Sequence, residues 1–489
     1  MIFAFALSGL QNFVYNLSPD ALSREDRQTQ GGRETYAARR LRIRSALLSL
    51  APAVVAWEIQ QSDPGSQVVY LGGGKLIILA SAEAIEAVEP KLRDLYSWLL
   101  LCSSGTLGAY WAAEPAEEAN SDSVRAAIHA LGQAKWRAGR FDTWPEAAFA
   151  IQSGAPKESL GDRDWESKQG AQLARRQELA GFAVGNGGWP LGPWSIRPVT
   201  DNPDIALAGR AQAQIQVSIP THAPSDQDGT VAELFKLAEE AEGAPYLALL
   251  KLDGDGIGKM IQGALEEGIQ KYENVSRKLS NFFGPDLMAL LDQKHPRIYL
   301  VYSGGDDLVA TGHFNAVLAC ARDVQRHYDK LGLGTVSAGI SFYARNSPVL
   351  NAVEAAETEL KNAKRTRNAV SLGGCRCSWQ DFGKAMDAVD GLVQAIRQDT
   401  LNRGALQLLK QLGEPWLDGT PPSLSETRWR SIPQLAYTRS RRTGWKEKEW
   451  PKPVLHLFDS LQANPDDWPR AALVGTLAAW RTKIRQEDQ

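Results

Sequence analysis

The sequence predicts an α+β protein with two ferredoxin-like palm domains followed by a C-terminal helical domain. Three observations support this. The second half of the chain alternates strand and helix patterns in the order of a palm, the first half repeats that order, and helical patterns alone follow residue 380.

The second half carries the clearest pattern. A compact apolar run at 245–253 predicts a buried strand, and two runs around Gly304-Gly305-Asp306-Asp307 predict a hairpin. Counting adjacent helices as one, the order is β-α-β-β-α-β-α, as in the palms of polymerases and nucleotide cyclases. The predicted strands are 245–253, 297–303, 307–311 and 334–344, and the predicted helices are 256–272, 276–293, 315–331 and 349–365.

The first half repeats this order of elements. Apolar alternation predicts a strand at 2–8, a hairpin at 67–80 and a strand at 106–113. Helical spacing predicts helices at 33–51, 82–100 and 123–139. We therefore predict a first palm at 1–145, a connecting or interface region at 146–240, a second palm at 241–378 and a helical domain at 379–489.

Composition is that of an ordinary globular protein. The chain has 489 residues, 43% of them hydrophobic, and a formal net charge of −3. No apolar run is long enough to cross a membrane, and the start of the chain lacks the features of a signal peptide. The four cysteines do not form paired C-x-x-C units, which disfavours a zinc ribbon, and we expect a cytoplasmic protein.

The predicted second palm gathers three acids at one edge of its sheet. Asp253 ends the first strand, and Asp306 and Asp307 occupy the hairpin turn beside it. Carboxylates so placed repel one another unless a cation lies between them. Hard oxygen ligands suit Mg²⁺ or Mn²⁺, and two such ions can activate a hydroxyl and stabilise a leaving pyrophosphate. The alternative is an ordinary hairpin turn, since Asp and Gly are favoured there.

Further residues around the acids are candidates for nucleotide contact. They are Ser303, Gly304 and Gly305 in the turn, and Lys364 and Lys259 on helices, where a long cation can reach a triphosphate. A cation at a helix C-terminus is also favourable without any ligand, which leaves a structural alternative for Lys364. Asp255 is either a helix N-cap or a further ligand.

The two predicted hairpin turns correspond residue by residue. Tyr70-Leu-Gly-Gly-Gly-Lys75 aligns with Tyr302-Ser-Gly-Gly-Asp-Asp307, so the first palm keeps the glycines and lacks the acids. Only the second palm is then expected to be catalytic. Gly72, Gly73 and Lys75 are candidate contacts for a nucleotide bound between the palms.

Three stretches together resemble the large polymerase-like subunit of type III CRISPR effector complexes. They are "ALSGLQNFVY" with "VVYLGGGKLIIL", the stretch "YLALLKLDGDGIGKMI", and "VYSGGDDLVA" with the helix that ends in "NAKR". Together with their surroundings they cover most of residues 1–150 and 215–370. The chain is similar to a compact variant, because it shows neither a His-Asp nuclease signature nor a four-cysteine module between the palms.

The resemblance implies an activity and partners. The activity is conversion of ATP into cyclic oligoadenylate second messengers on target-RNA recognition, in antiviral defence. The implied partners are a guide RNA, a target RNA, backbone subunits and a small helical subunit. By position, Asp253, Asp306 and Asp307 match the family's metal-binding acids. Two alternatives stay open: a stand-alone palm cyclase that makes small cyclic nucleotides, and a non-catalytic scaffold subunit.

Local basic runs are the only sequence features that favour RNA contact directly. Residues 24–44 hold seven arginines against three acids, and residues 428–452 hold eight Lys or Arg against two acids, with three tryptophans. Such runs are either solvated faces or nucleic-acid contacts. We expect the second run, including Arg439, Arg441 and Arg442, to contribute to activation or assembly.

Overall fold

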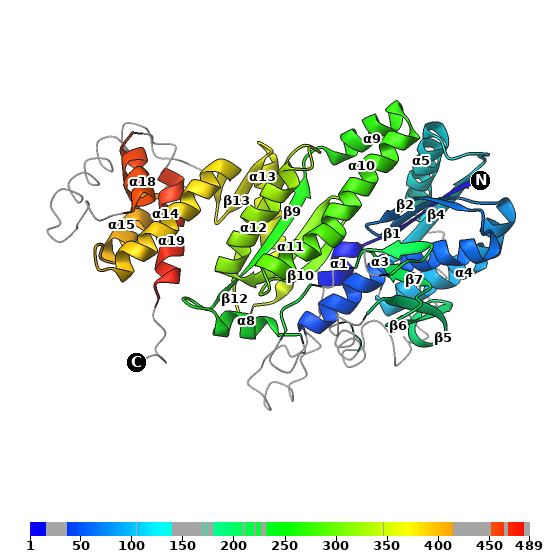
Figure 1. Cartoon of the computed structure of the whole chain (residues 1–489), viewed down its shortest axis with the longest axis horizontal. Helices are drawn as coiled ribbons and strands as arrows, with labels where there is room; N and C mark the ends of the chain where they lie inside the picture. Colours follow the sequence, from blue (N-terminus) through cyan, green and yellow to red (C-terminus); the bar gives the residue numbers. More distant parts are fainter. Residues whose placement is uncertain are drawn as a thin grey trace.

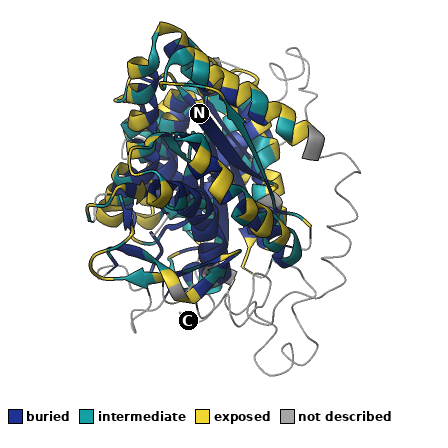
Figure 2. Cartoon of the chain, turned by 90° about the vertical axis from the view of Figure 1, so that its right-hand side faces the viewer, coloured by how far each residue is buried: buried dark blue, intermediate teal, exposed yellow. Residues whose placement is uncertain are grey.

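A computed structural model describes most of the chain: residues 1–15, 37–103, 105–138, 169, 173, 179–208, 211–219, 222–225, 231–345, 347–413, 451–463 and 468–483. The N-terminal sheet lies at one end of the molecule and the C-terminal helices at the other, with the largest sheet between them (Figure 1). Buried strands lie inside, and exposed residues lie on the outer faces of the helices (Figure 2).

The first palm is a four-stranded sheet in the order β2-β3-β1-β4. Central strand β1 is buried on both faces, as its unbroken apolar run requires. The strands are β1 (Ile2–Ser8), β2 (Gln67–Gly72), β3 (Lys75–Leu79) and β4 (Gly108–Glu114), and the helices are α1 (Leu10–Tyr15), α3 (Ala37–Ser62), α4 (Ala82–Cys102) and α5 (Ser121–Ala138).

The second palm is a six-stranded sheet in the order β10-β11-β9-β12-β13-β14. Strand β9 (Tyr246–Gly254) is central and antiparallel to both neighbours, β11 (Asp307–His313) and β12 (Val336–Ala344). The remaining strands are β10 (Tyr299–Gly304), β13 (Ala369–Leu372) and β14 (Cys375–Ser378). The β13–β14 hairpin was not predicted from the sequence; two glycines with positive φ, Gly373 and Gly374, form its turn.

Helices cover the second palm, and two of them differ from the prediction. The helix predicted at 256–272 is interrupted at Gly268, whose φ of +132° no helix accommodates. The helix predicted at 276–293 contains a π-helical segment, because Pro285 has no N–H to donate and Gly284 leaves helical geometry. The helices are α9 (Ile257–Glu267), α10 (Ile269–Asn281), η3 (Phe282–Asp286), α11 (Leu287–Lys294), α12 (Phe314–Asp329) and α13 (Val349–Lys364).

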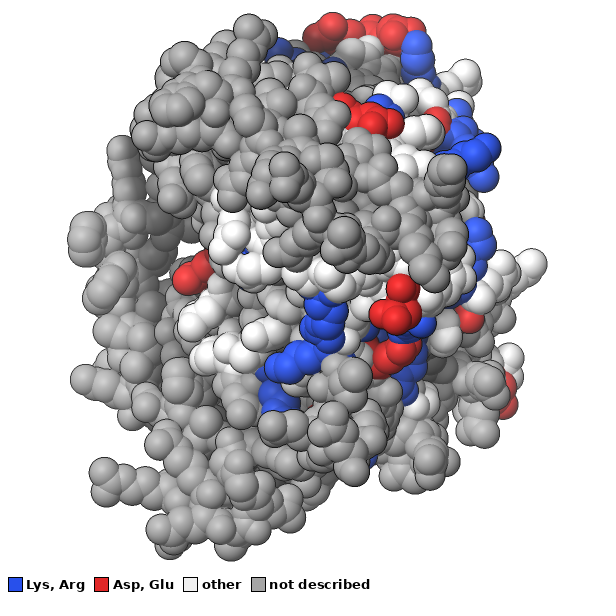
Figure 3. Space-filling model, turned by 90° about the vertical axis from the view of Figure 1, so that its left-hand side faces the viewer, with Lys and Arg blue, Asp and Glu red and all other residues white. Residues whose placement is uncertain are grey.

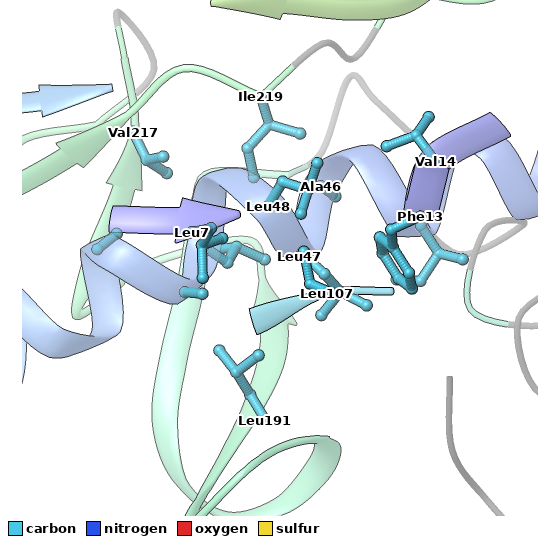
Figure 4. Close-up of a cluster of buried hydrophobic side chains, with 14 of the residues drawn as sticks. Leu7, Phe13, Val14, Ala46, Leu47, Leu48, Leu107, Leu191, Val217 and Ile219 are labelled. Carbon is cyan, nitrogen blue, oxygen red and sulfur yellow. The ribbon is translucent and has the colours of Figure 1, made fainter. Parts of the chain in front are cut away.

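The region predicted as a connection contains a sheet of its own, in the order β6-β5-β7-β8. Its apolar side chains enter the core of the first palm beside α3, where Leu191, Val217 and Ile219 lie near Leu47 and Leu48 (Figure 4). The Gly- and Trp-rich stretch, predicted as a connecting or interface segment, therefore forms a packed hairpin, which was not predicted from the sequence. The elements are β5 (Gly181–Leu191), β6 (Trp194–Val199), β7 (Ile205–Leu207), β8 (Ile215–Val217) and α8 (Leu234–Glu240).

The C-terminal helices pack on one end of the second palm. They are α14 (Trp379–Arg397), α15 (Gly404–Gly413), α18 (Lys452–Ala463) and α19 (Trp468–Arg481). Trp480 joins them to β9, because its ring contacts Tyr246 at a centroid distance of 4.6 Å and its carbonyl accepts from the Ala244 N–H at 2.8 Å.

This end of the molecule shows both acidic and basic side chains among its described residues (Figure 3). Most of the basic run 428–452, with Arg439, Arg441 and Arg442, lies outside the described residues. None of the helices described combines the length and the apolar character that a membrane span requires.

The predicted fold class is confirmed: two ferredoxin-like sheets with a helical C-terminal part. The domain boundaries at 145, 240 and 378 stay predictions.

Packing of α13 onto the second-palm sheet depends on one glycine, and this generates a prediction. A Cβ at Gly339 of β12 would lie 2.2 Å from both the Ala356 carbonyl oxygen and the Leu360 nitrogen of α13. We expect Gly339→Ala to lower the free energy of unfolding by at least about 2 kcal/mol, because backbone must move. Gly263→Ala on α9, where no atom lies within 4 Å, is the control. Equal urea midpoints for the two variants would contradict this packing.

Candidate active site

Strand register brings the three predicted acids together. In the antiparallel pair β9–β11, Asp253 lies directly opposite Asp307. The Gly254 N–H donates to the Asp306 carbonyl at 3.0 Å, which extends the pairing into the turn. Acids that are 53 residues or more apart in the sequence therefore meet at one sheet edge, as predicted.

The hairpin turn holds Asp306 in a conformation that permits a side chain. Gly305 has a φ of +69°, and the φ of Asp306 is not positive. A positive φ at the first central residue alone is the sign pattern of a type II′ turn. In the first palm both central residues, Gly73 and Gly74, have positive φ, at +55° and +75°. An acid at position 74 would be strained there, so the two turns differ in backbone as well as in sequence.

Asp306 and Asp307 are more buried than is favourable for a charged carboxylate. Burial, followed by the charge of Asp253, raises the pKa of Asp306. Burial, followed by the charges of Asp306 and Asp253, raises the pKa of Asp307 to about 7. The Asp307 Oδ1 atom is buried and accepts no hydrogen bond. A bound cation would relieve both the repulsion and the lost hydration.

Asp253 already has a cationic partner. The Lys364 Nζ lies 2.6 Å from Asp253 Oδ2 and donates to the Gly254 carbonyl oxygen at 2.9 Å. Lys364 therefore reaches the acids from the end of α13, as its candidate role requires. In this arrangement the described residues hold no group of three His, Cys, Asp or Glu side chains close enough to bind a metal ion.

Asp255 is not the helix N-cap that the sequence offered as one alternative. Gly256 is the N-cap of α9, and no side chain caps that helix. The Asp255 carboxylate accepts hydrogen bonds from the Ser337 and Thr335 hydroxyls at 2.7 and 2.8 Å and from the Asn368 N–H at 2.8 Å. Its side chain is only 3% exposed.

A buried lysine beside the acids was missed by sequence reasoning. Lys251 lies two residues before Asp253 on β9, is 3% exposed and is paired with Glu357 of α13. Its charge lowers the pKa of Asp307 against the larger effect of burial. The sequence signal for Lys251 is its position inside an apolar strand run, since lysines are rarely buried without a partner.

The glycine turns of the two palms face each other. A Cβ on Gly304 would lie 3.5 Å from the Gly73 Cα, and one on Gly73 would lie 3.6 Å from the Gly305 nitrogen. Methyl groups would just fit, whereas larger side chains would separate the turns. A cavity of about 170 Å³ lies beside this contact, lined by both turns and by residues of β8 and α10, among them Gly72, Ser218, Asn281 and Ser303.

The remaining candidates take different positions. Lys75 is exposed at the start of β3, and its charge lowers the pKa of Asp306, so it faces the acids from the first palm. Lys259 is exposed on the first turn of α9. The Ser303 hydroxyl donates to the Phe283 carbonyl oxygen of the π-helical segment, so it supports the turn from behind.

The residues at this edge fit Mg²⁺ or Mn²⁺. Their donors are carboxylate oxygens, one of them buried without a hydrogen-bond partner, and hard oxygen donors of this kind suit these two ions.

Comparison with protein families supports this assignment of the second palm. Residues 246–371 match the family model described as Cas10/Cmr2, second palm domain. A relative from Methanocaldococcus jannaschii, a CRISPR system single-strand-specific deoxyribonuclease Cas10/Csm1 of subtype III-A, is 25% identical over 226 residues. A protein of the same description from Enterococcus italicus is 36% identical over 112 residues. These alignments cover 36% and 22% of this chain but only 28% and 15% of the relatives.

Solved structures show the same fold over nearly the whole chain. The apo Csm1–Csm4 cassette matches with a TM-score of 0.71 at 18% identity, covering 98% of this chain and 70% of that one. The same cassette in complex with one ATP matches at 0.70, and in complex with cA4 at 0.69. The resemblance predicted from the sequence is therefore confirmed.

The buried carboxylate of Asp307 generates a prediction about pH. Its pKa of about 7 lies above the ordinary value, so the contribution of Asp307 to wild-type stability should fall as pH rises from about 4 to 7. Asp307→Asn removes that charge. Without metal, its melting temperature should exceed the wild-type value by a margin that grows from pH 5 to pH 8.

Exposed Asp201 provides the control, and Asp201→Asn should track the wild type at every pH. Added Mn²⁺ should stabilise the wild type and not Asp307→Asn, because a ligand of the native state raises its stability. Parallel melting curves for wild type and Asp307→Asn across this pH range would contradict the assignment.

Proposed function

We propose that this chain, whose residues 246–371 match the second palm domain of the Cas10/Cmr2 family, is a metal-dependent nucleotidyltransferase that converts ATP into cyclic oligoadenylates. It would act as the large subunit of a type III CRISPR effector when the complex recognises target RNA. One observation carries the proposal: an acid-bearing glycine turn of the second palm contacts an acid-free glycine turn of the first palm, with a cavity beside the contact.

The reaction is attack of a ribose 3′-hydroxyl of one ATP on the α-phosphate of a second. A phosphodiester bond forms, and the bond to pyrophosphate breaks. Mg²⁺ or Mn²⁺, when bound, activates the hydroxyl and offsets the charge of the leaving group. Asp253, Asp306 and Asp307 would hold the metal, and their negative charge excludes other anions from that position.

The glycines and cations would place the nucleotides. Gly304 and Gly305 let a triphosphate approach the backbone of the second palm, and Gly72 and Gly73 do the same for a nucleotide on the first. Lys75, Lys259 and Lys364 supply positive charge around the phosphates. Lys364 lies at the acids, where it contacts Asp253 and donates to the Gly254 carbonyl oxygen.

The contact between the turns supports control by the relative position of the palms. The cavity of about 170 Å³ is smaller than the 300–1,000 Å³ typical of ligand pockets, so two ATP molecules require the turns to separate. A small shift of the first palm, favoured by contacts in an RNA-bound complex, would open the site. This fits a synthase that is silent until RNA binds.

The proposed partners follow from the family. Solved relatives include a Csm1–Csm4 subcomplex of the type III-A CRISPR-Csm interference complex. For this chain we propose a guide RNA, a target RNA, and backbone and small helical subunits. The scaffold alternative is disfavoured, since a scaffold gains nothing from a buried carboxylate oxygen that accepts no hydrogen bond.

The test is incubation of the purified protein with labelled ATP and Mg²⁺ or Mn²⁺, with and without its RNA complex, followed by mass analysis of products. Replacing both Asp306 and Asp307 by Ala should lower product by at least about 100-fold, since charge stabilisation worth several kcal/mol is lost. Adjacent exposed acids on α9, Glu266 and Glu267, provide a matched double-alanine control.

Unchanged synthesis by the Asp306/Asp307 variant would refute the proposed site. Full-rate synthesis by the isolated wild-type chain, with no response to any RNA complex, would favour the stand-alone cyclase. Products containing bases other than adenine would correct the substrate and leave the reaction class intact.

A further inference from the structure

Asp255 differs from Asp253 and Asp307 in the number of hydrogen bonds that its carboxylate accepts. Asp253 is 32% exposed and held by one ammonium group, and Asp307 has a buried oxygen that accepts nothing. Asp255 instead accepts three hydrogen bonds and is 3% exposed. Three hydrogen bonds fill most of the acceptor positions of the Asp255 carboxylate, two at Oδ2 and one at Oδ1.

The donors to Asp255 come from two segments, one at the start of β12 and one just after α13. Thr335 and Ser337 lie at the start of β12, and the Asp255 N–H also donates to the Thr335 carbonyl at 2.8 Å. The third donor is the backbone N–H of Asn368, just after α13. Asp255 therefore links the end of β9 to the segment that leads from α13 into β13.

That segment is held in an unfavourable backbone conformation. Arg367 and Asn368 have φ of +56° and +46°, left-handed values that are costly for a residue with a side chain, although less so for Asn. Two such residues in succession persist only when neighbouring contacts fix them. The bond from the Asn368 N–H to Asp255 is such a contact.

The segment is rich in cations and adjoins the acids. Lys364, Arg365 and Arg367 lie within four positions, and the two arginines are exposed. Neither arginine pairs with an acid of the described residues, and Lys364 Nζ lies 2.6 Å from Asp253 and 4.0 Å from Asp255. The Gly254 carbonyl oxygen, which accepts from Lys364 Nζ at 2.9 Å, is a further partner that holds the ammonium group at the site.

We propose that Asp255 is a positioning residue which holds Lys364–Asn368 as a cradle for the triphosphate of the bound nucleotide, and that it is not a metal ligand. This rests on the proposed function and adds to it the group that fixes the phosphate-binding cations. Asp255 touches neither metal nor nucleotide and acts through Asn368 and Lys364.

The test separates metal binding from nucleotide binding. Mn²⁺ affinity is measured by titration calorimetry on the full chain without nucleotide. Affinity for a non-hydrolysable ATP analogue is then measured at saturating Mn²⁺. Asp255→Asn should keep the Mn²⁺ affinity within about twofold and weaken analogue binding about tenfold, the effect of losing one charge-assisted contact. Asp253→Asn should weaken Mn²⁺ binding at least about tenfold.

A milder pair of variants keeps the test valid if Asp255→Asn does not fold. Ser337→Ala removes one donor to Asp255 and should weaken analogue binding about threefold with unchanged Mn²⁺ affinity. Ser341→Ala is the control, because this serine lies on the same strand and donates to Ala352 of α13 instead. It should leave both affinities unchanged.

Loss of Mn²⁺ affinity in Asp255→Asn equal to that in Asp253→Asn would make Asp255 a ligand and overturn the inference. Equal effects of Ser337→Ala and Ser341→Ala on analogue binding would also overturn it. A wild-type protein that binds the Mn²⁺–analogue pair but forms no oligoadenylate would count against the proposed activity alone, so the two failures are distinguishable.

Discussion

Crowding of carboxylates at the end of β9 is the constraint on which the second palm depends. The register of β9 and β11 sets Asp253 opposite Asp307, and the turn adds Asp306. Burial, followed by repulsion between the carboxylates, raises the pKa values of Asp306 and Asp307. Two lysines add positive charge near these carboxylates: Lys364 at the open end of the sheet and Lys251 within it. The same α13 that carries Lys364 also carries Glu357, the partner of Lys251.

The first palm is the uncharged counterpart of this arrangement. Its hairpin keeps the same irregularity before the turn: the register shifts between Val68 and Tyr70 and, in the second palm, between Leu300 and Tyr302. The repeat therefore extends to backbone geometry. The first-palm turn has two central glycines with positive φ, so it presents backbone and no acidic side chain. The charge of Lys75, which follows the turn, lowers the pKa of Asp306 against the larger effect of burial. This asymmetry supports our proposal of one catalytic centre shared by the two palms.

Much of this was predictable, and the exceptions have physical causes. Strands β1 and β9 are largely apolar, so their burial could be predicted, and turn chemistry located Asp306 and Asp307. The π-helical segment was missed because helical spacing continues through Gly284 and Pro285 in the sequence. The role of Asp255 was missed because its donors, Thr335, Ser337 and Asn368, are at least 80 residues away. The sheet β5–β8 was missed because its Gly, Pro and Trp content indicated a connecting or interface segment, whereas its apolar residues complete the core around α3.

The central claim is that metal and nucleotide meet between the two glycine turns, on acids of the second palm alone. The most direct measurement is the structure of crystals containing Mn²⁺ and a non-hydrolysable ATP analogue, with anomalous diffraction at the manganese edge. The account predicts manganese on Asp253 and the Asp306–Asp307 turn, Lys364 moved from Asp253 to the phosphates, and the turns farther apart than in the structure described above. Manganese bound by first-palm residues, or a nucleotide bound away from both turns, would contradict it.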